Sequence, residues 1–333
     1  MKRYSFFSFT SLFLSAIFFI SCGSGSSPKT QTNQPDRPAV KNSPDFDADS
    51  AYTYVEKQTL FGSRVPNTQA HIQCGDFLVR EMERFGAKVI EQKAILKAYN
   101  GESLNARNII GVFNEDKKDR ILLFAHWDSR PYADHDPNPD NHKTPVLGAN
   151  DGASGVGVLM EVARQIGMKE PNIGVDIIFF DAEDYGTPSF YEGNTGEDTW
   201  CLGAQYWAVN PHVPGYSAQF GILLDMVGAK NAVFMKEGFS MHYAANYVEK
   251  IWKKANELGY GRFFVSENGG YITDDHYYVN RLANIPSVDI IHLEKNSPNG
   301  FFEHWHTVND TMEHIDKETL KAVGQTLLEI VYE

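Results

Sequence analysis

Residues 175–184 read VDIIFFDAED, and this stretch decides the fold of the 333-residue chain. A largely apolar run leads directly into three acidic residues, Asp181, Glu183 and Asp184. A run of this length, rich in β-branched and aromatic residues, is typical of a strand that is buried on both faces of a parallel sheet. Because burying an unpaired carboxylate is costly, the acids at the end of this strand indicate a functional site.

Other segments repeat the pattern of short apolar runs bounded by polar or turn residues. They are RNIIGVF (107–113), RILLFAHWD (120–128), FGILLDMVG (220–228) and SVDIIHL (287–293). Helical patterns lie between them at 153–166, 241–261 and 316–331, and residues 47–85 form two helical pieces that break near FGSRVPNT. This alternation predicts an α/β fold with a mixed, largely parallel central sheet flanked by helices, in a single domain over residues 46–333.

The first residues indicate export. Lys2 and Arg3 precede an apolar stretch that ends at Ser21-Cys22, which predicts a bacterial lipoprotein signal peptide over 1–21 and acylation of Cys22. Residues 22–45 are polar and rich in Ser, Pro and Asn, so they are expected to form a flexible tether. The prediction is a lipid-anchored protein of the bacterial envelope, facing the periplasm.

The net charge and the cysteine count limit the partners and the disulfide bonds that we expect. The formal net charge is −13, and loss of Lys2 and Arg3 with the signal makes it −15, which argues against a nucleic-acid partner. With Cys22 acylated, Cys74 and Cys201 remain, and they form either a disulfide or two buried free thiols. We expect a monomer.

Polar residues with metal-binding side chains follow several of the predicted strands. In open α/β sheets ligands bind beyond the carboxyl ends of the strands, so these side chains are expected to meet at one edge. Carboxylates and imidazoles without nearby cysteine are typical of a catalytic zinc site with an open coordination position. The set is His126, Asp151, Glu183, Asp184, Asp225 and His306.

Not every acid in this set needs to bind metal. Neighbouring residues on a turning chain point in different directions, so of Glu183 and Asp184 one can ligate zinc while the other acts as general base. For Asp128 and Asp181 we expect a role in orienting neighbours through hydrogen bonds.

Six short motifs in this order resemble the zinc aminopeptidase superfamily, and within it most of all the zinc-dependent glutaminyl cyclases of the animal-like type that also occurs in bacteria. The motifs are AHWDS (125–129), GANDGASG (148–155), FFDAED (179–184), LLDMVG (223–228), TDDH (273–276) and WHT (305–307). The resemblance covers residues 47 to the end. It implies an enzyme that converts the N-terminal glutamine of peptides or proteins to pyroglutamate and releases ammonia.

The resemblance also implies a role for each matching residue. Asp151, Asp184 and His306 match the ligands of a single zinc, with Asp184 standing where the animal enzyme has Glu. Glu183 matches the proton-shuttling acid. Further matches are the active-site aspartates Asp225 and Asp274, a network histidine at His292, a pocket aromatic at Trp305 and, through a looser alignment, Trp200.

Two alternatives use the same residues. In a di-zinc aminopeptidase, His126 and Asp225 would join as ligands, Asp151 would bridge two zinc ions, and Glu183 would activate water. Asp274 and Trp305 favour the cyclase. A third alternative, a binding lipoprotein without activity, predicts loss of a ligand or of the acid, and none is lost.

Overall fold

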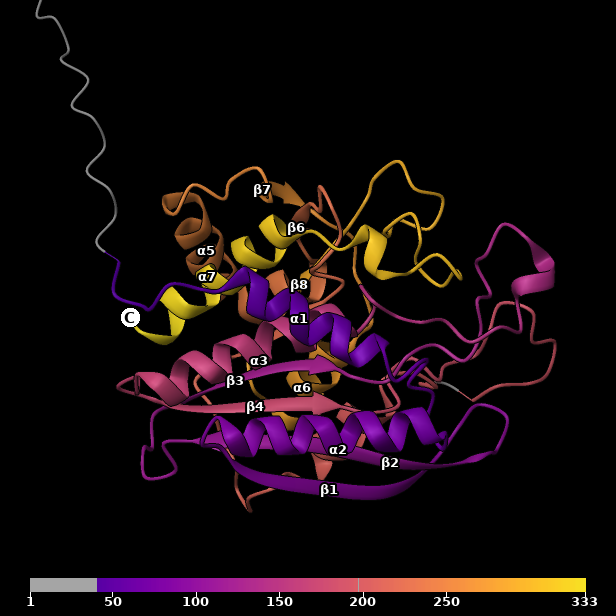
Figure 1. Ribbon diagram of the computed structural model, residues 1–333, viewed down its shortest axis with the longest axis horizontal. Coiled ribbons are helices and arrows are strands. Elements are labelled where there is room, and N and C mark those ends of the chain that lie inside the picture. Colours follow the sequence, from indigo (N-terminus) through magenta and orange to yellow (C-terminus); the bar gives the residue numbers. More distant parts are fainter. Residues whose placement is uncertain (1–40, 197) are drawn as a thin grey trace, which may run out of the picture. The chain divides into compact units, whose positions relative to one another are not determined.

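The protein is organised around a central six-stranded sheet (Figure 1). The structure is a computed structural model that describes residues 41–196 and 198–333. From one edge to the other, the strands are β1 (Lys88–Lys97), β2 (Ser103–Phe113), β4 (Gly174–Phe180), β3 (Arg120–His126), β5 (Gly221–Asp225) and β8 (Ser287–Ile291). A separate parallel pair is formed by β6 (Phe234–Lys236) and β7 (Phe264–Asn268).

The four strands β4, β3, β5 and β8 run parallel, whereas β1, β2 and β4 pair antiparallel. All four parallel strands therefore end at the same edge of the sheet. Strand β4 has buried residues throughout, with Ile177 and Phe179 in one hydrophobic core and Ile178 and Phe180 in another. This arrangement explains why residues 177–180 are apolar at four consecutive positions rather than alternating.

Helices cover both faces of the sheet. On one face α1, α3 and α7 pack together, as Figure 1 shows, with α2 and α5 contributing to the same core. On the other face α4 and α6 pack against each other. The helices of the described residues are α1 (Ala48–Thr59), α2 (Gln69–Arg84), α3 (Ala153–Met168), α4 (Leu202–Val209), α5 (Gly238–Glu257), α6 (Asp275–Ala283), α7 (Lys317–Val331) and the short 3₁₀ turns η1 (Pro139–Asn141) and η2 (Met312–His314).

The predicted fold class is confirmed, and the described residues fold as one unit. Strands β1, β6 and β7 and helices α4 and α6 were not predicted. The predicted signal peptide, Cys22 and tether residues 22–40 lie outside the described residues. Residues 42–44, assigned to the tether, contact α7, where the Ser43 hydroxyl donates to Glu329 over 2.6 Å. No helix in the described ranges is long and apolar enough to cross a membrane.

Candidate active site

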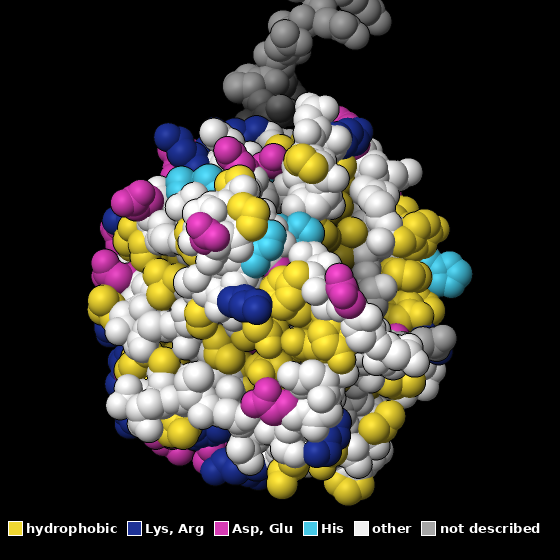
Figure 2. Space-filling view, turned by 90° about the vertical axis from the view of Figure 1, so that its right-hand side faces the viewer, with side chains coloured by type: hydrophobic (Ala, Val, Ile, Leu, Met, Phe, Trp, Pro, Cys, Tyr) yellow, Lys and Arg dark blue, Asp and Glu magenta, His cyan; other side chains and the backbone are white. Residues whose placement is uncertain are grey.

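A cavity of about 380 Å³ lies where the loops after the parallel strands meet. Its lining includes acids at the ends of β4 and β5, the segment before α6 and the loop that carries His306. Hydrophobic side chains gather in the middle of the face shown in Figure 2, with histidines at their edge. No lysine or arginine is among the lining residues. The cavity therefore suits a small group that carries positive charge.

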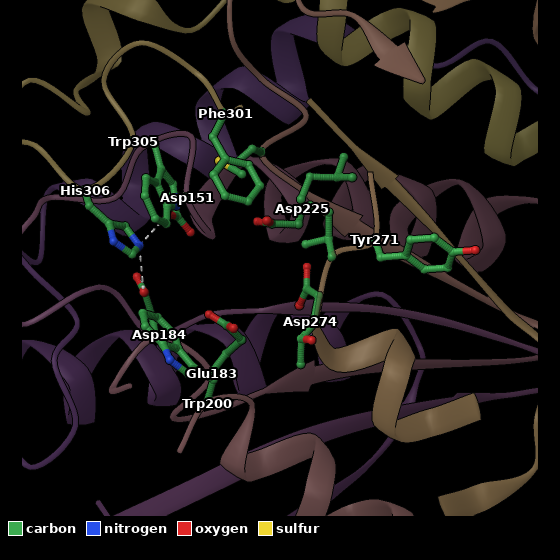
Figure 3. A pocket seen from close by; sticks show the side chains of 14 residues that line it. Asp151, Glu183, Asp184, Trp200, Asp225, Tyr271, Asp274, Phe301, Trp305 and His306 are labelled. Carbon is green, nitrogen blue, oxygen red and sulfur yellow. Dashed lines mark ion pairs between the residues drawn. The ribbon is translucent and has the colours of Figure 1, made fainter. Parts of the chain in front are cut away.

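Three predicted ligands converge on one side of the cavity (Figure 3). His306 Nε2 lies 3.1 Å from Asp184 and 3.6 Å from Asp151, and one ligand atom from each residue lies within 4.8 Å of the others. Both carboxylate oxygens of Asp184 are buried without a hydrogen-bond partner. Two carboxylates and one imidazole with unsatisfied buried oxygens fit a zinc ion with an open position.

Residues that the sequence did not reveal hold these ligands in place. Asp310 accepts the backbone N–H groups of Asn150 and Asp151 over 2.8 and 3.0 Å. Behind His306, Asp134 lies 3.5 Å from Nδ1 and is itself held by Arg130. Such carboxylates fix the orientation of metal ligands, yet they come from distant loops without a motif of their own.

A second group of candidate ligands shares Asp151 with the first. His126 Nε2 lies 2.9 Å from Asp151 and 3.3 Å from Asp225, and these three residues also satisfy the geometry of a metal-binding group. The described residues therefore offer two candidate metal-binding groups that share Asp151.

Glu183 lies at the centre of the cavity, and Asp128 fixes its backbone. The two carboxylate oxygens of Asp128 accept the N–H groups of Glu183 and Asp184, each over 3.1 Å. Burial raises the pKa of Glu183 well above its usual range, and the charges of Asp274 and Asp184 raise it further. A carboxyl group with a raised pKa can both accept and return a proton near neutral pH.

Asp225 and Asp274 form another wall of the cavity (Figure 3). Burial raises the pKa of Asp225 to about 7, with Asp151 and Asp274 contributing. Burial also raises the pKa of Asp274. Asp181, by contrast, points away from the cavity and pairs with His71 over 2.9 Å.

Aromatic side chains close the sides of the cavity. Trp305 stacks on His306 with ring centroids 3.7 Å apart, and Trp200 is nearly parallel to His306 at 5.9 Å. Phe301 and Tyr271 also line the cavity and were not predicted. Both predicted tryptophans therefore face the site.

Among the described residues, no hydrogen bond or ion pair joins His292 to Asp274, so its role in that network stays a prediction. The His292 side chain is buried with Nε2 3.2 Å from Glu294, and it does not line the cavity. Asp289, three residues earlier on β8, instead groups with Asp274 and His276.

The disulfide interpretation of the two cysteines is wrong, because Cys74 and Cys201 are both free and buried. Cys201 belongs to a set of non-glycine residues near the site with a left-handed backbone, the others being Ala182, Met226 and His306. Such conformations persist only where the surrounding structure holds them, and they concentrate at functional sites.

Carboxylates and imidazoles gathered at the carboxyl ends of parallel strands define a metal-dependent α/β enzyme. The chain belongs to peptidase family M28, whose family pattern matches residues 108–331. This membership confirms the predicted relation to the zinc aminopeptidase superfamily.

Solved structures and curated relatives refine the comparison. A Zn-dependent exopeptidase from Parabacteroides distasonis is 61% identical, with a TM-score of 0.86, over 87% of this chain and 99% of that one. The Bacteroides thetaiotaomicron glutaminyl cyclase bound to N-acetylhistamine is 58% identical, with a TM-score of 0.85 and the same coverage. Glutaminyl-peptide cyclotransferase of Bothrops jararaca is 26% identical over 254 residues, 68% of this chain. The match spans 65% of the length of that curated relative.

Proposed function

We propose that this chain is a zinc-dependent glutaminyl cyclase that converts the N-terminal glutamine of peptides or proteins to pyroglutamate and releases ammonia. The observation that carries the proposal is the position of Asp274 opposite Glu183, with carboxylate oxygens of both within 4.8 Å of one another. Two oxygens at that separation can both lie within hydrogen-bond distance, about 2.9 Å, of one amino nitrogen. The 58% identity to a glutaminyl cyclase supports the same assignment.

The reaction follows from what the chain's residues hold. The substrate's α-amine donates hydrogen bonds to Glu183 and Asp274, which aim its nitrogen at the γ-carbonyl carbon of the same residue. Glu183 takes a proton from the amine as the ring closes, and returns it to the amide nitrogen, which leaves as ammonia. Nucleophile and electrophile belong to one residue, so no water is activated.

We assign one zinc ion per chain to Asp151, Asp184 and His306. When bound there, zinc supplies Lewis-acid polarisation of the γ-amide carbonyl. Trp200 and Trp305 flank the ligands and provide apolar walls against the glutamine side chain. The small cavity admits an N-terminal residue and leaves the rest of a peptide outside.

Mass spectrometry of two peptides tests this function. A peptide that begins with Gln should lose the mass of one ammonia, and a matched peptide that begins with Leu should stay intact. The Glu183→Gln variant, which keeps the shape of the side chain, should leave both unchanged. Release of a whole N-terminal residue from either peptide would refute the proposal.

A di-zinc aminopeptidase is the second candidate, because His126, Asp151 and Asp225 form the additional group of ligands. It predicts two zinc ions per chain, one of which is lost in His126→Ala. The cyclase predicts one zinc ion, and the same count in that variant. Metal analysis of both proteins distinguishes the two.

We further propose that Cys22 is acylated and anchors a monomeric enzyme in the bacterial envelope on the periplasmic side. The sequence of residues 1–22 supports this assignment. Labelling with a fatty-acid precursor should mark the wild-type protein, and Cys22→Ser should abolish the label. A label that persists in the variant would exclude acylation at this position.

A further inference from the structure

A thiol lies directly behind the carboxylate that we assign to proton transfer. Cys201 Sγ is 3.3 Å from Glu183 Oε1, and the cysteine side chain is fully buried. The two segments are also tied together through the backbone, because Cys201 N–H donates to the Glu183 carbonyl over 2.9 Å and Leu202 N–H to that of Ala182 over 3.1 Å. The thiol is therefore held at a fixed position beside the carboxylate.

Glu183, Cys201 and Asp274 together have the geometry of a cation site. One ligand atom from each lies within 4.8 Å of the other two. With zinc–sulfur and zinc–oxygen bonds of about 2.3 and 2.0 Å, a sulfur and an oxygen ligand of a tetrahedral site stand about 3.5 Å apart. The Sγ–Oε1 distance of 3.3 Å is close to that separation. This group shares no residue with either group that contains Asp151.

The residues around Glu183, Cys201 and Asp274 would also favour a bound cation. Both carboxylate oxygens of Asp275 are buried without a hydrogen-bond partner. Burial raises the pKa of Cys201 and of Glu183, and the charge of Asp275 raises both further. No lysine or arginine lines this cavity. A buried carboxylate without a partner is costly, and a nearby cation would offset that cost.

We propose that Glu183, Cys201 and Asp274 form an inhibitory site for a thiophilic divalent cation, such as Cd²⁺ or excess Zn²⁺. The cation enters from the cavity between Glu183 and Asp274, both of which line it. As the sulfur–metal bond forms, the S–H bond breaks and the proton leaves to solvent. Each cation that binds therefore releases one proton. A soft thiolate among hard carboxylates favours Cd²⁺ and Zn²⁺ over Mg²⁺ and Ca²⁺.

Inhibition follows because a carboxylate bound to a cation cannot accept a proton from the substrate. This consequence rests on the proposed function of Glu183, whereas binding of the cation does not. Two readouts are therefore needed. One is the ultraviolet charge-transfer band of a cadmium–thiolate bond, and the other is turnover of a peptide that begins with Gln.

The experiment titrates Cd²⁺ into the full-length zinc-loaded protein and its variants. The wild type should develop the thiolate band in step with inhibition. Cys201→Ser and Cys201→Ala should both lack the band and need about tenfold or more Cd²⁺ for half inhibition of their own activity. Cys74→Ser, which changes the other buried cysteine, should behave as the wild type. His126→Ala should keep the band, because the group that it alters contains no sulfur.

Each result bears on the proposal in a different way. A wild type without the band, or a band that persists in either Cys201 variant, overturns it. Use of both serine and alanine covers the case in which one substitution prevents folding. A band that depends on Cys201 but leaves turnover unchanged supports the cation site, but it overturns the inhibition and the role of Glu183 as proton shuttle.

Discussion

Glu237 is the buried acid whose removal gives the most quantitative test of the structure. It precedes α5, and its carboxylate accepts the N–H groups of Phe239 and Ser240 over 2.8 and 2.6 Å. The same carboxylate accepts the N–H of Ile272 and contacts His276 Nε2, each at 2.9 Å. Glu237 thus joins the start of α5 to the segment that carries Asp274 to the cavity.

The stability that Glu237 contributes can be worked out from its pKa. Burial alone would raise this pKa, but the hydrogen bond and charge of His276 and the backbone donors lower it from 4.5 to about 2. A difference of that size between unfolded and folded states corresponds to about 3 kcal/mol. Because the folded pKa is the lower one, this stability is fully present above about pH 4.5. It is lost as the pH falls toward 2, and about half is gone near pH 3.

Urea unfolding of Glu237→Gln tests this reasoning. At pH 7 the free energy of unfolding should be about 3 kcal/mol lower than in the wild type, and the difference should narrow steadily below pH 4.5. Glu249→Gln on the same helix is the control, since its side chain is mostly exposed and its pair with Lys236 should contribute less than about 1 kcal/mol. A loss below about 1 kcal/mol at pH 7, or a difference that does not change with pH, would refute the argument.

Three further changes probe the site and the packing around it. Glu183→Gln should lower turnover on Gln-peptides by about 10²–10⁴-fold with unchanged zinc content, measured by steady-state kinetics and metal analysis. Asp128→Asn should lower zinc affinity or turnover by about 10–100-fold, because the amide replaces one of the two accepting oxygens with an NH2 group that can only donate. Gly155→Ala should reduce the free energy of unfolding by about 1–3 kcal/mol, since a Cβ there would lie 2.3 Å from the Leu224 carbonyl oxygen, whereas Gly196→Ala meets no atom within 4 Å and should be neutral.

The strands predicted from the sequence are those with long buried apolar runs. Strands β1, β6 and β7, which lack such runs, were not predicted. Strand β4 is apolar at consecutive positions because two cores enclose it. Strand β1 lies at the sheet edge, and its residues are half-buried or exposed, so it has no continuous apolar run. Helix α6 begins directly after Asp274, whose side chain caps its N-terminus. The helix was not predicted, because the acids of the TDDH motif were assigned to the active site and not to a helix start.

Site residues were predictable where they lie at or just after the carboxyl ends of the parallel strands. His126 and Asp225 are the last residues of β3 and β5, and Glu183 lies three residues after β4, so the topology alone brings them together. Asp134 and Asp310 were not predictable, because they lie far in sequence from the ligands that they contact. Only the folded loops bring them together. Asp310 accepts the N–H of Asn150 across 160 residues of sequence. Only the folded loops reveal such support.

The geometry of His126 bears on why one fold can serve both a cyclase and a peptidase. Its Nε2 lies between Asp151 and Asp225, at 2.9 and 3.3 Å. With zinc at the first group alone, this nitrogen could share its hydrogen between the two carboxylates; with a second zinc, it would be a ligand. The first-group ligands and Glu183 need not change between the two states. What separates the two reactions is the nucleophile: a peptidase needs a water molecule activated beside Glu183, whereas the amine of an N-terminal glutamine arrives with the substrate and needs only Glu183 and Asp274 to hold it.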